Sequence, residues 1–269
     1  MLLRNKNAVI YGAGGSLGGA ITRAFAKAGA NLFISGHNMS PVKKLADEIA
    51  KDGGKVEAAE VDALDEKAVN EYLDAVIKKA GTVDISLNLI SLLDKQNVPL
   101  VDLKKDDFTR PLFRAIETHF ITDTAAARQM QKQKSGVILS LTATPGGIGY
   151  ANTGGFGPAC KFIESFSTNL ASEMGPSGVR VVNIRSAGSP DSKVFKDAIE
   201  QGGERVVAFI DKIKNDTMLK EMPLMADIAN VAVFLASDMA AMITGVTIDV
   251  TAGTTAALNY KVTDVAFQE

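Results

Sequence analysis

Short apolar runs alternate with amphipathic stretches along nearly the whole chain. Residues 8–11 form a continuous apolar run, which favours a strand covered on both faces of its sheet. Apolar residues then recur every three or four positions up to Ala28, which predicts a helix, and Gly29 is a typical helix stop. The further predicted strands are residues 31–35, 55–61, 83–90, 137–141 and 179–184.

The connections between these strands set the predicted architecture. Each connection is long enough to hold a helix, and the longest helical stretches are predicted at about residues 106–134 and 158–174. Crossovers of this length join parallel strands and place helices on both faces of the sheet. The sequence therefore predicts an α/β fold with a doubly wound parallel sheet.

No linker, repeat or low-complexity segment divides the chain, so residues 1–269 are predicted to form a single domain. A polar, helical insertion at about residues 189–222 interrupts the alternation late in the chain. Such a segment near the carboxyl edge of a sheet suits a lid on the substrate side, although a plain surface excursion fits the pattern equally well.

The amino-acid composition bears on whether the protein binds nucleic acid, metal or membrane. Lys and Arg total 29 and Asp and Glu total 31, so the formal net charge is −2 and no basic surface for nucleic acid is indicated. A lone Cys160 excludes an internal disulfide and a Cys-rich metal site, which fits a reducing compartment. No apolar run is long enough to span a bilayer. These observations predict a cytoplasmic protein with no metal, membrane or nucleic-acid partner.

A glycine-rich turn, G-A-G-G-S-L-G-G, follows the first predicted strand and opens the first helix at residues 12–19. Glycine permits positive φ and a close approach of the backbone, and the amides at a helix N-terminus attract anions. Its position after the first strand of a doubly wound sheet predicts that Gly12, Ser16, Leu17 and Gly18 hold a dinucleotide pyrophosphate. A tight strand-to-helix turn without a ligand is the alternative.

At this turn the chain resembles the short-chain dehydrogenase/reductase family. The family's loop motif is T-G-x-x-x-G-x-G, and Tyr11, Gly12, Ser16 and Gly18 stand at its four named positions. Two of the four positions differ, because Tyr replaces Thr and Ser replaces the middle Gly.

Four later segments carry the same resemblance over nearly the whole chain. Val-Asp at residues 61–62 matches the family's adenine-contacting Asp, and residues 83–91 match V-D-x-L-V-N-N-A-G with one Asn kept, Asn88. Residues 183–188 parallel N-x-x-x-P-G, and residues 227–245 are similar to the family's C-terminal helix and the turn into its last strand.

The resemblance implies a Rossmann-type sheet in the order 3-2-1-4-5-6-7 and hydride transfer with NAD(P)(H) to or from a small-molecule substrate. It implies that Asp62, Ala63, Asn88 and Gly188 contact the cofactor. It further implies a homotetramer or homodimer, for which the apolar C-terminal helix and strand suit an interface.

The end of the second strand, I-S-G-H-N, bears on which nucleotide binds. An acidic residue at this point takes the ribose 2′-hydroxyl of NAD, whereas a cation accommodates the 2′-phosphate of NADP. Here Gly36 and His37 replace the acid, which removes both the hydrogen bond to NAD and the repulsion of a phosphate. The sequence therefore favours NADP(H), with NAD possible.

This chain differs most from the family at the family's catalytic positions. In the family a Tyr phenol acts as acid and base, a Lys one helical turn later lowers its pKa, and a Ser hydroxyl steadies the substrate oxygen. In this chain Ala143 stands at the Ser, Gly157 or Phe156 at the Tyr, and Ala115 at the helical Asn that completes the set. Lys161 is predicted to be the family Lys, which holds the ribose and supports catalysis.

Three interpretations of this departure remain open. In the first, another group supplies the proton: Tyr150 and Thr142 are the leading candidates, and Thr144 and His119 are further ones. In the second, Lys161 retains only its ribose contact and the chain is a cofactor-binding or regulatory protein without turnover. In the third, the substrate needs no strong acid, as when hydride adds to an activated double bond.

Overall fold

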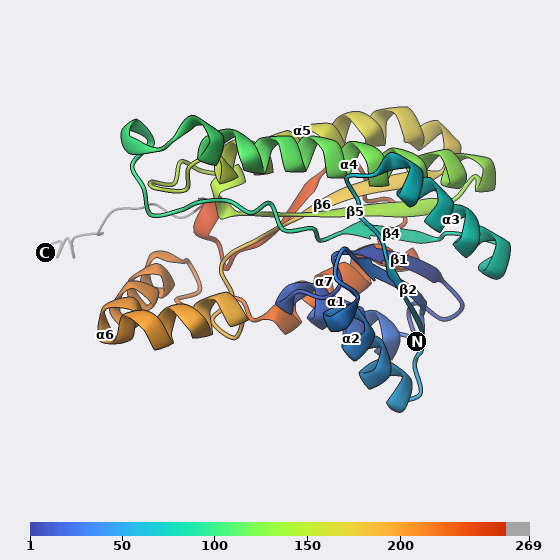
Figure 1. The fold of residues 1–269 in the computed structure, drawn as a ribbon, viewed down its shortest axis with the longest axis horizontal. Helices are drawn as coiled ribbons and strands as arrows, with labels where there is room; N and C mark the ends of the chain where they lie inside the picture. Colours follow the sequence, from blue (N-terminus) through green and yellow to red (C-terminus); the bar gives the residue numbers. More distant parts are fainter. Residues whose placement is uncertain (257–269) are drawn as a thin grey trace, which may run out of the picture.

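A seven-stranded parallel sheet forms the centre of the computed structural model, which describes residues 1–256. The strand order is β3-β2-β1-β4-β5-β6-β7, as the family resemblance implies (Figure 1). The strands are β1 (Asn7–Tyr11), β2 (Asn31–Gly36), β3 (Lys55–Glu60), β4 (Ile85–Asn88), β5 (Gly136–Ala143), β6 (Val179–Ser186) and β7 (Thr247–Val250).

Two layers of helices cover the sheet (Figure 1). One layer holds α1 (Ser16–Lys27), α2 (Met39–Lys51) and α7 (Met225–Ala236). The other holds α3 (Glu66–Ala80), α4 (Lys105–Gln133) and α5 (Phe156–Met174). The predicted doubly wound α/β fold is therefore confirmed. The single-domain prediction for residues 1–269 includes residues 257–269, which lie outside the described part.

Alternating side chains of the strands build a core on each face. In β1, Ala8 and Ile10 pack into one apolar cluster, whereas Val9 and Tyr11 pack into the other. All five residues of β1 are buried, which explains why its sequence is a continuous apolar run. Burial on both faces fixes the register of this central strand, since a shift by one residue would exchange the two sets of side chains.

The register brings the carboxyl ends of three strands together. Tyr11, the last residue of β1, pairs with Ser35 of β2 on one side and with Asn88 of β4 on the other. The chain winds outward in opposite directions from β1 and β4, so the crevice between their ends is a topological switch point. Ligands of doubly wound sheets bind at such a crevice.

Strand β4 is shorter than the predicted run of residues 83–90, for a local reason at each end. Before the strand, the Val83 amide donates to the side chain of Gln133. After it, the Ile90 amide donates to the Asn88 side chain at 3.0 Å, which turns the chain away from the sheet.

The predicted insertion at residues 189–222 contains α6 (Lys193–Asp216), which stands beyond the end of the layer of α1, α2 and α7 (Figure 1). This helix buries no residue and has a non-helical conformation at Gly203. Its role as a lid stays a prediction. No helix within residues 1–256 combines the length and apolar content that a bilayer crossing requires.

A buried ion pair joins α5 to the far half of the sheet. The Arg185 guanidinium on β6 donates to both oxygens of Glu164, at 2.9 and 2.8 Å, and to Asp249 of β7 at 2.8 Å. Hydrogen bonds to Glu164 are the main cause of a raised Arg185 pKa. The Thr142 hydroxyl donates to Glu164 and accepts from Asn183, so strands β5, β6 and β7 share one polar network.

We expect Glu164→Gln to lower the free energy of unfolding by about 2 kcal/mol, because Arg185 loses its charged partner on α5 and keeps only the one on β7, Asp249. Urea denaturation followed by circular dichroism measures the change. The matched control is Glu173→Gln, an exposed position on the same helix, which should change stability by less than about 0.5 kcal/mol. Equal effects of the two substitutions would contradict a structural role for the ion pair.

Candidate functional site

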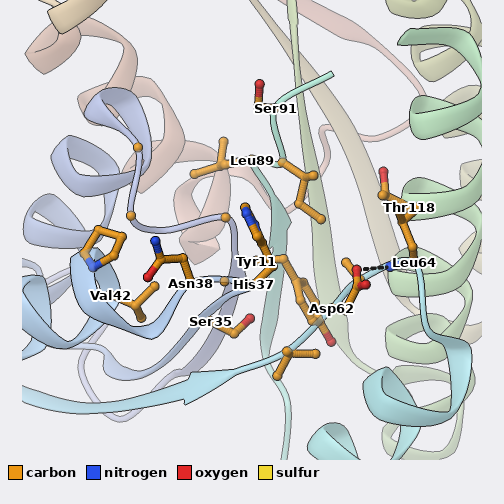
Figure 2. Close-up of a pocket in the computed structure, with 18 of the residues that line it drawn as sticks. Tyr11, Ser35, His37, Asn38, Val42, Asp62, Leu64, Leu89, Ser91 and Thr118 are labelled. Atoms are coloured by element: carbon orange, nitrogen blue, oxygen red, sulfur yellow. Dashed lines mark hydrogen bonds between the residues drawn. The ribbon is translucent and has the colours of Figure 1, made fainter. Parts of the chain in front are cut away.

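A pocket of about 360 Å³ lies at the carboxyl ends of β1, β2 and β4 (Figure 2). Its lining includes Gly12, His37, Asp62 and Ala63, four of the residues predicted to bind cofactor. Figure 2 places Asn38 and Val42 on one side of the pocket and Asp62 and Thr118 on the other. The structure therefore gathers residues from three separate loops around one hollow at the switch point.

The glycine-rich turn passes closely between neighbouring backbones. Gly12 has φ of 75°, and a Cβ atom there would lie 2.6 Å from the Leu89 carbonyl oxygen. A Cβ atom on Gly18 would lie 2.7 Å from the carbonyl oxygen of Gly12. Gly15 precedes α1 and provides no capping side chain, so the first-turn amides remain available to an anion. This cradle fits the pyrophosphate of a dinucleotide.

The end of β2 forms the wall beside α2. Gly36, His37 and Asn38 all line the pocket, and the Asn38 side chain accepts a hydrogen bond from the Ser40 amide to cap α2. No carboxylate stands at this point. The wall offers His37 and the N-terminal end of α2 to a ligand, and both suit an anionic group better than a carboxylate would.

The opposite wall is built after β3. One oxygen of Asp62 accepts from the Leu64 amide at 3.0 Å, the contact dashed in Figure 2, and its second oxygen makes no hydrogen bond within residues 1–256. The Tyr11 ring lies beside Asp62 and meets Tyr72 edge to face, with ring centres 6.0 Å apart. Burial raises the pKa of the Tyr11 phenol well above its ordinary value, so this hydroxyl stays protonated.

Asn88, another predicted cofactor ligand, is engaged inside the protein. Its carbonyl oxygen accepts from the Ile90 amide, and its amide group donates to the Thr122 hydroxyl at 3.0 Å. Asn88 does not line the pocket, whereas Leu89 and Ile90 do. The structure thus gives Asn88 a positioning role for the turn that follows β4. Next to Thr122, the buried His119 side chain lies 3.0 Å from Asp123.

The first turn of α6 contacts two other predicted ligand positions. The Lys193 amide donates to the Ser16 hydroxyl at 3.3 Å. The Phe195 ring packs so closely on Gly188 that a Cβ atom there would overlap it. Neither Ser16, Leu17, Gly18 nor Gly188 lines the pocket. The cofactor contacts of these residues stay predictions.

The family's catalytic positions lie in an apolar corner. Ala143 ends β5, and Ala115 of α4 belongs to an apolar cluster with Leu92 and Ile163, against which Phe156 packs. None of these side chains can donate or accept a proton.

Cys160, not Lys161, faces the end of β5. The family spacing, taken from Ala143 without a gap, leads through Phe156 to Cys160. The Cys160 thiol is buried, and burial raises its pKa to about 12 even though a hydrogen bond from the Ala143 backbone opposes the shift. The side chain of Lys161 is 69% exposed, with its Nζ 3.5 Å from Glu164. Successive helical residues are turned by about 100° from each other, so Cys160 and Lys161 have different surroundings. The predicted role of Lys161 in ribose binding and catalysis stays a prediction.

The other two predicted catalytic residues lie apart. The Thr142 hydroxyl is buried and shared between Glu164 and Asn183. Tyr150 lies with Lys161 along a second, more open hollow of about 770 Å³, and desolvation raises the pKa of its phenol. Roles for Thr142 and Tyr150 in proton transfer stay predictions.

Among the pocket residues that sequence reasoning missed are two polar ones from α4, Arg114 and Thr118. Thr118 could have been found from its helical spacing, because it lies three positions after Ala115. Arg114 has no comparable signal, since an Arg on a long helix is most often a solvated side chain.

Comparisons with known proteins agree with this geometry. Residues 12–255 match the family model described as Enoyl-(Acyl carrier protein) reductase. The 7alpha-hydroxysteroid dehydrogenase of Escherichia coli K12 is 28% identical over 257 residues, covering 96% of this chain and 97% of that protein. The 3-oxoacyl-[acyl-carrier-protein] reductase of Chlamydia muridarum is 28% identical over 258 residues, covering 94% and 98%.

Solved structures share the fold. NAD⁺-bound xylitol dehydrogenase has a TM-score of 0.87 at 23% identity, covering 94% of this chain and 100% of that one. A short-chain type dehydrogenase/reductase from Mycobacterium ulcerans has a TM-score of 0.88 at 20% identity, covering 96% and 92%. Because the family model spans most of the chain, the protein belongs to the short-chain dehydrogenase/reductase family of NAD(P)-dependent oxidoreductases.

Proposed function

We propose that this protein binds NADP(H) in the switch-point pocket and transfers hydride between it and a small carbonyl, alcohol or activated alkene. The observation that carries the proposal is the pocket itself, in which a glycine turn, an uncapped helix N-terminus and Asp62 converge. NAD is the alternative nucleotide, and the absence of a carboxylate after β2 favours NADP.

Within this proposal each loop has a separate task. The backbone of Gly12 and the first turn of α1 hold the diphosphate, with Ser16, Leu17 and Gly18 in that turn. His37 faces the 2′-phosphate, and Asp62 with Ala63 binds the adenine. Gly188 contacts the nicotinamide half of the cofactor. When bound, the nicotinamide supplies or takes up the hydride.

The side chains at the family's catalytic positions, Ala143, Ala115 and Phe156, favour an activated alkene as the hydride acceptor. Reduction of a ketone needs a proton at its oxygen, which the side chains of Ala143 and Phe156 cannot deliver. Burial raises the pKa of the Cys160 thiol to about 12, which makes it a weaker acid than an ordinary tyrosine phenol. An alkene conjugated to a carbonyl takes its proton at carbon and can take it from water. The description of the matched family model, an enoyl reductase, is in keeping with this acceptor. Tyr150 and Thr142 remain candidates for a proton donor.

A second candidate function is cofactor binding without turnover. The packing of Ala115 and Phe156 into one apolar cluster favours it, because a corner sealed by hydrophobic side chains excludes the water that a proton relay needs.

We also propose a cytoplasmic homodimer or homotetramer. Met239, Met242 and Val246 are exposed between α7 and β7, where the sequence predicts an interface. Burying such side chains between subunits would remove apolar surface from water.

His37→Asp should weaken NADPH binding about tenfold relative to NADH, because a carboxylate repels the 2′-phosphate and accepts a hydrogen bond from the ribose. Fluorescence titration of both reduced cofactors measures the ratio. His37→Asn, which adds no charge, is the control and should leave the ratio within about threefold. The assignment to NADP fails if the unaltered protein prefers NADH.

Lys161→Ala should leave NADPH affinity within about twofold, since an exposed side chain with one long ion pair contributes little. The same fluorescence titration measures this. A loss of about tenfold or more would instead support the ribose contact expected from the sequence.

The triple substitution Ala143→Ser, Phe156→Tyr and Cys160→Lys should create ketone reduction. Acetoacetyl-CoA and crotonyl-CoA have four-carbon acyl groups and serve as matched carbonyl and alkene substrates. We expect NADPH oxidation with crotonyl-CoA before the change and with acetoacetyl-CoA only after it, by about 100-fold or more over background. Thermal melting checks that the variant folds. Turnover with neither substrate before the change, together with tight NADPH binding, would favour the non-catalytic alternative.

A further inference from the structure

The second hollow, of about 770 Å³, has a lining that is uncharged except for one side chain. Its walls come from the loop before α4, the turn after β5 and the first turns of α5. The larger side chains on these walls are those of Leu100, Val101, Phe108, Ile148 and Tyr150. Among the lining residues that the structure describes, only Lys161 carries a charge. This lining fits a ligand that is apolar except for one anionic group.

Two backbone contacts hold the walls of this hollow together. The Asn97 amide donates to the Asn152 carbonyl oxygen at 2.8 Å. Gly154 lies against the Lys95 carbonyl oxygen, which a Cβ atom on Gly154 would approach to 2.8 Å. The hollow is therefore preformed, so a ligand does not have to order its walls on binding.

The Lys161 ammonium lies at the end of the hollow nearest β5. Its Nζ is 3.5 Å from the Glu164 carboxylate, which a Cβ atom on Gly146 would overlap. Gly146 lines the hollow three residues after the end of β5. Glu164 has closer contacts with Arg185, at 2.9 and 2.8 Å, so the longer contact leaves the charge of Lys161 accessible to an anion.

This end of the hollow also adjoins the end of β6. The Thr144 hydroxyl, in the turn after β5, donates to the carbonyl oxygen of Ser186, the last residue of β6, at 3.3 Å. Gly188, which the proposed function places against the nicotinamide half of the cofactor, follows two residues later. A ligand held by Lys161 therefore has its anionic group on the side of the hollow where hydride transfer is proposed.

We propose that Lys161 binds a carboxylate of the substrate and that the hollow receives the apolar body of the same molecule. The inference rests on the proposed function and narrows its substrate class to carboxylic acids with an apolar chain or ring. Lysine suits this role because its compact charge stands on a flexible stem, which can follow ligands of different length. Crotonyl-CoA has the reacting double bond without this carboxylate, so it reports the chemistry and not the contact.

The experiment compares octanoate with octanamide, in which a neutral amide replaces the carboxylate, by isothermal titration calorimetry on the full chain. The unaltered protein should bind octanoate about fivefold more tightly, the effect of one accessible ion pair. Lys161→Met keeps an apolar stem without the charge and should bind both compounds with the affinity of octanamide. Lys161→Arg restores a cation and should restore the preference.

Lys212→Met is the matched control, because Lys212 pairs with Asp216 on α6 and does not line the hollow. This variant should keep the fivefold preference, and thermal melting checks that each variant folds. Equal binding of the two compounds by the unaltered protein, no binding of either, or a preference that persists in Lys161→Met would overturn the proposal. Failure of NADPH and NADH to bind would overturn the proposed function instead, and fluorescence titration of the cofactors detects that result separately.

Discussion

The close approach of the first loop to the end of β4 is the constraint on which the site depends. The Gly12 backbone lies against the Leu89 carbonyl, and Gly18 lies against the Gly12 carbonyl, with no room for a side chain at either contact. This packing brings the N-terminus of α1 to the switch point, where its amides face the crevice. The hydrogen bonds of Asn88 hold the other side of the contact, because they fix the turn that carries Leu89 and Ile90.

Around strands β5, β6 and β7, apolar side chains and a structural ion pair stand where the family has its catalytic side chains. Ala115 and Phe156 join an apolar cluster, and burial keeps the neighbouring Cys160 thiol neutral by raising its pKa. The buried charges of this region instead belong to Glu164 and Arg185, which pair with each other behind the turn at residues 144–146. A Cβ atom on Gly146 would meet the Glu164 carboxylate, so the ion pair supports this turn directly. The polar side chains of Glu164 and Arg185 thus hold strands β5, β6 and β7 and the turn at residues 144–146 in place.

Much of the fold was predictable from the sequence because it follows from burial. The continuous apolar run of β1, the stop at Gly29 and the crossover lengths specify a doubly wound sheet, and Gly29 indeed has φ of 96°. Gly12, His37 and Asp62 were predictable as pocket residues because each lies within two residues of the end of a parallel strand. A predicted position that is wrong by one residue still lies at the pocket when it is at the end of a strand, whereas on a helix it lies on a different face.

Helical residues were harder to place for a geometrical reason. On a helix, one residue separates the buried Cys160 from the exposed Lys161, so a spacing counted with an error of one residue points to a side chain in different surroundings. Arg114 was missed because its place in the pocket wall depends on its contact with Ser91 in the turn after β4, which the helical periodicity of α4 does not indicate.

The contacts of α6 link the two halves of the nucleotide site. This helix buries no side chain, yet its first turn meets Ser16 in the phosphate loop and Gly188 after β6. A segment with so little buried surface has low local stability and can shift at a small free-energy change. Any ligand that competes for the Ser16 hydroxyl or for the surface of Gly188 therefore acts on the same weakly held turn. The first turn of α6 thus contacts both Ser16 and Gly188, even though the pocket lining contains no residue of that helix.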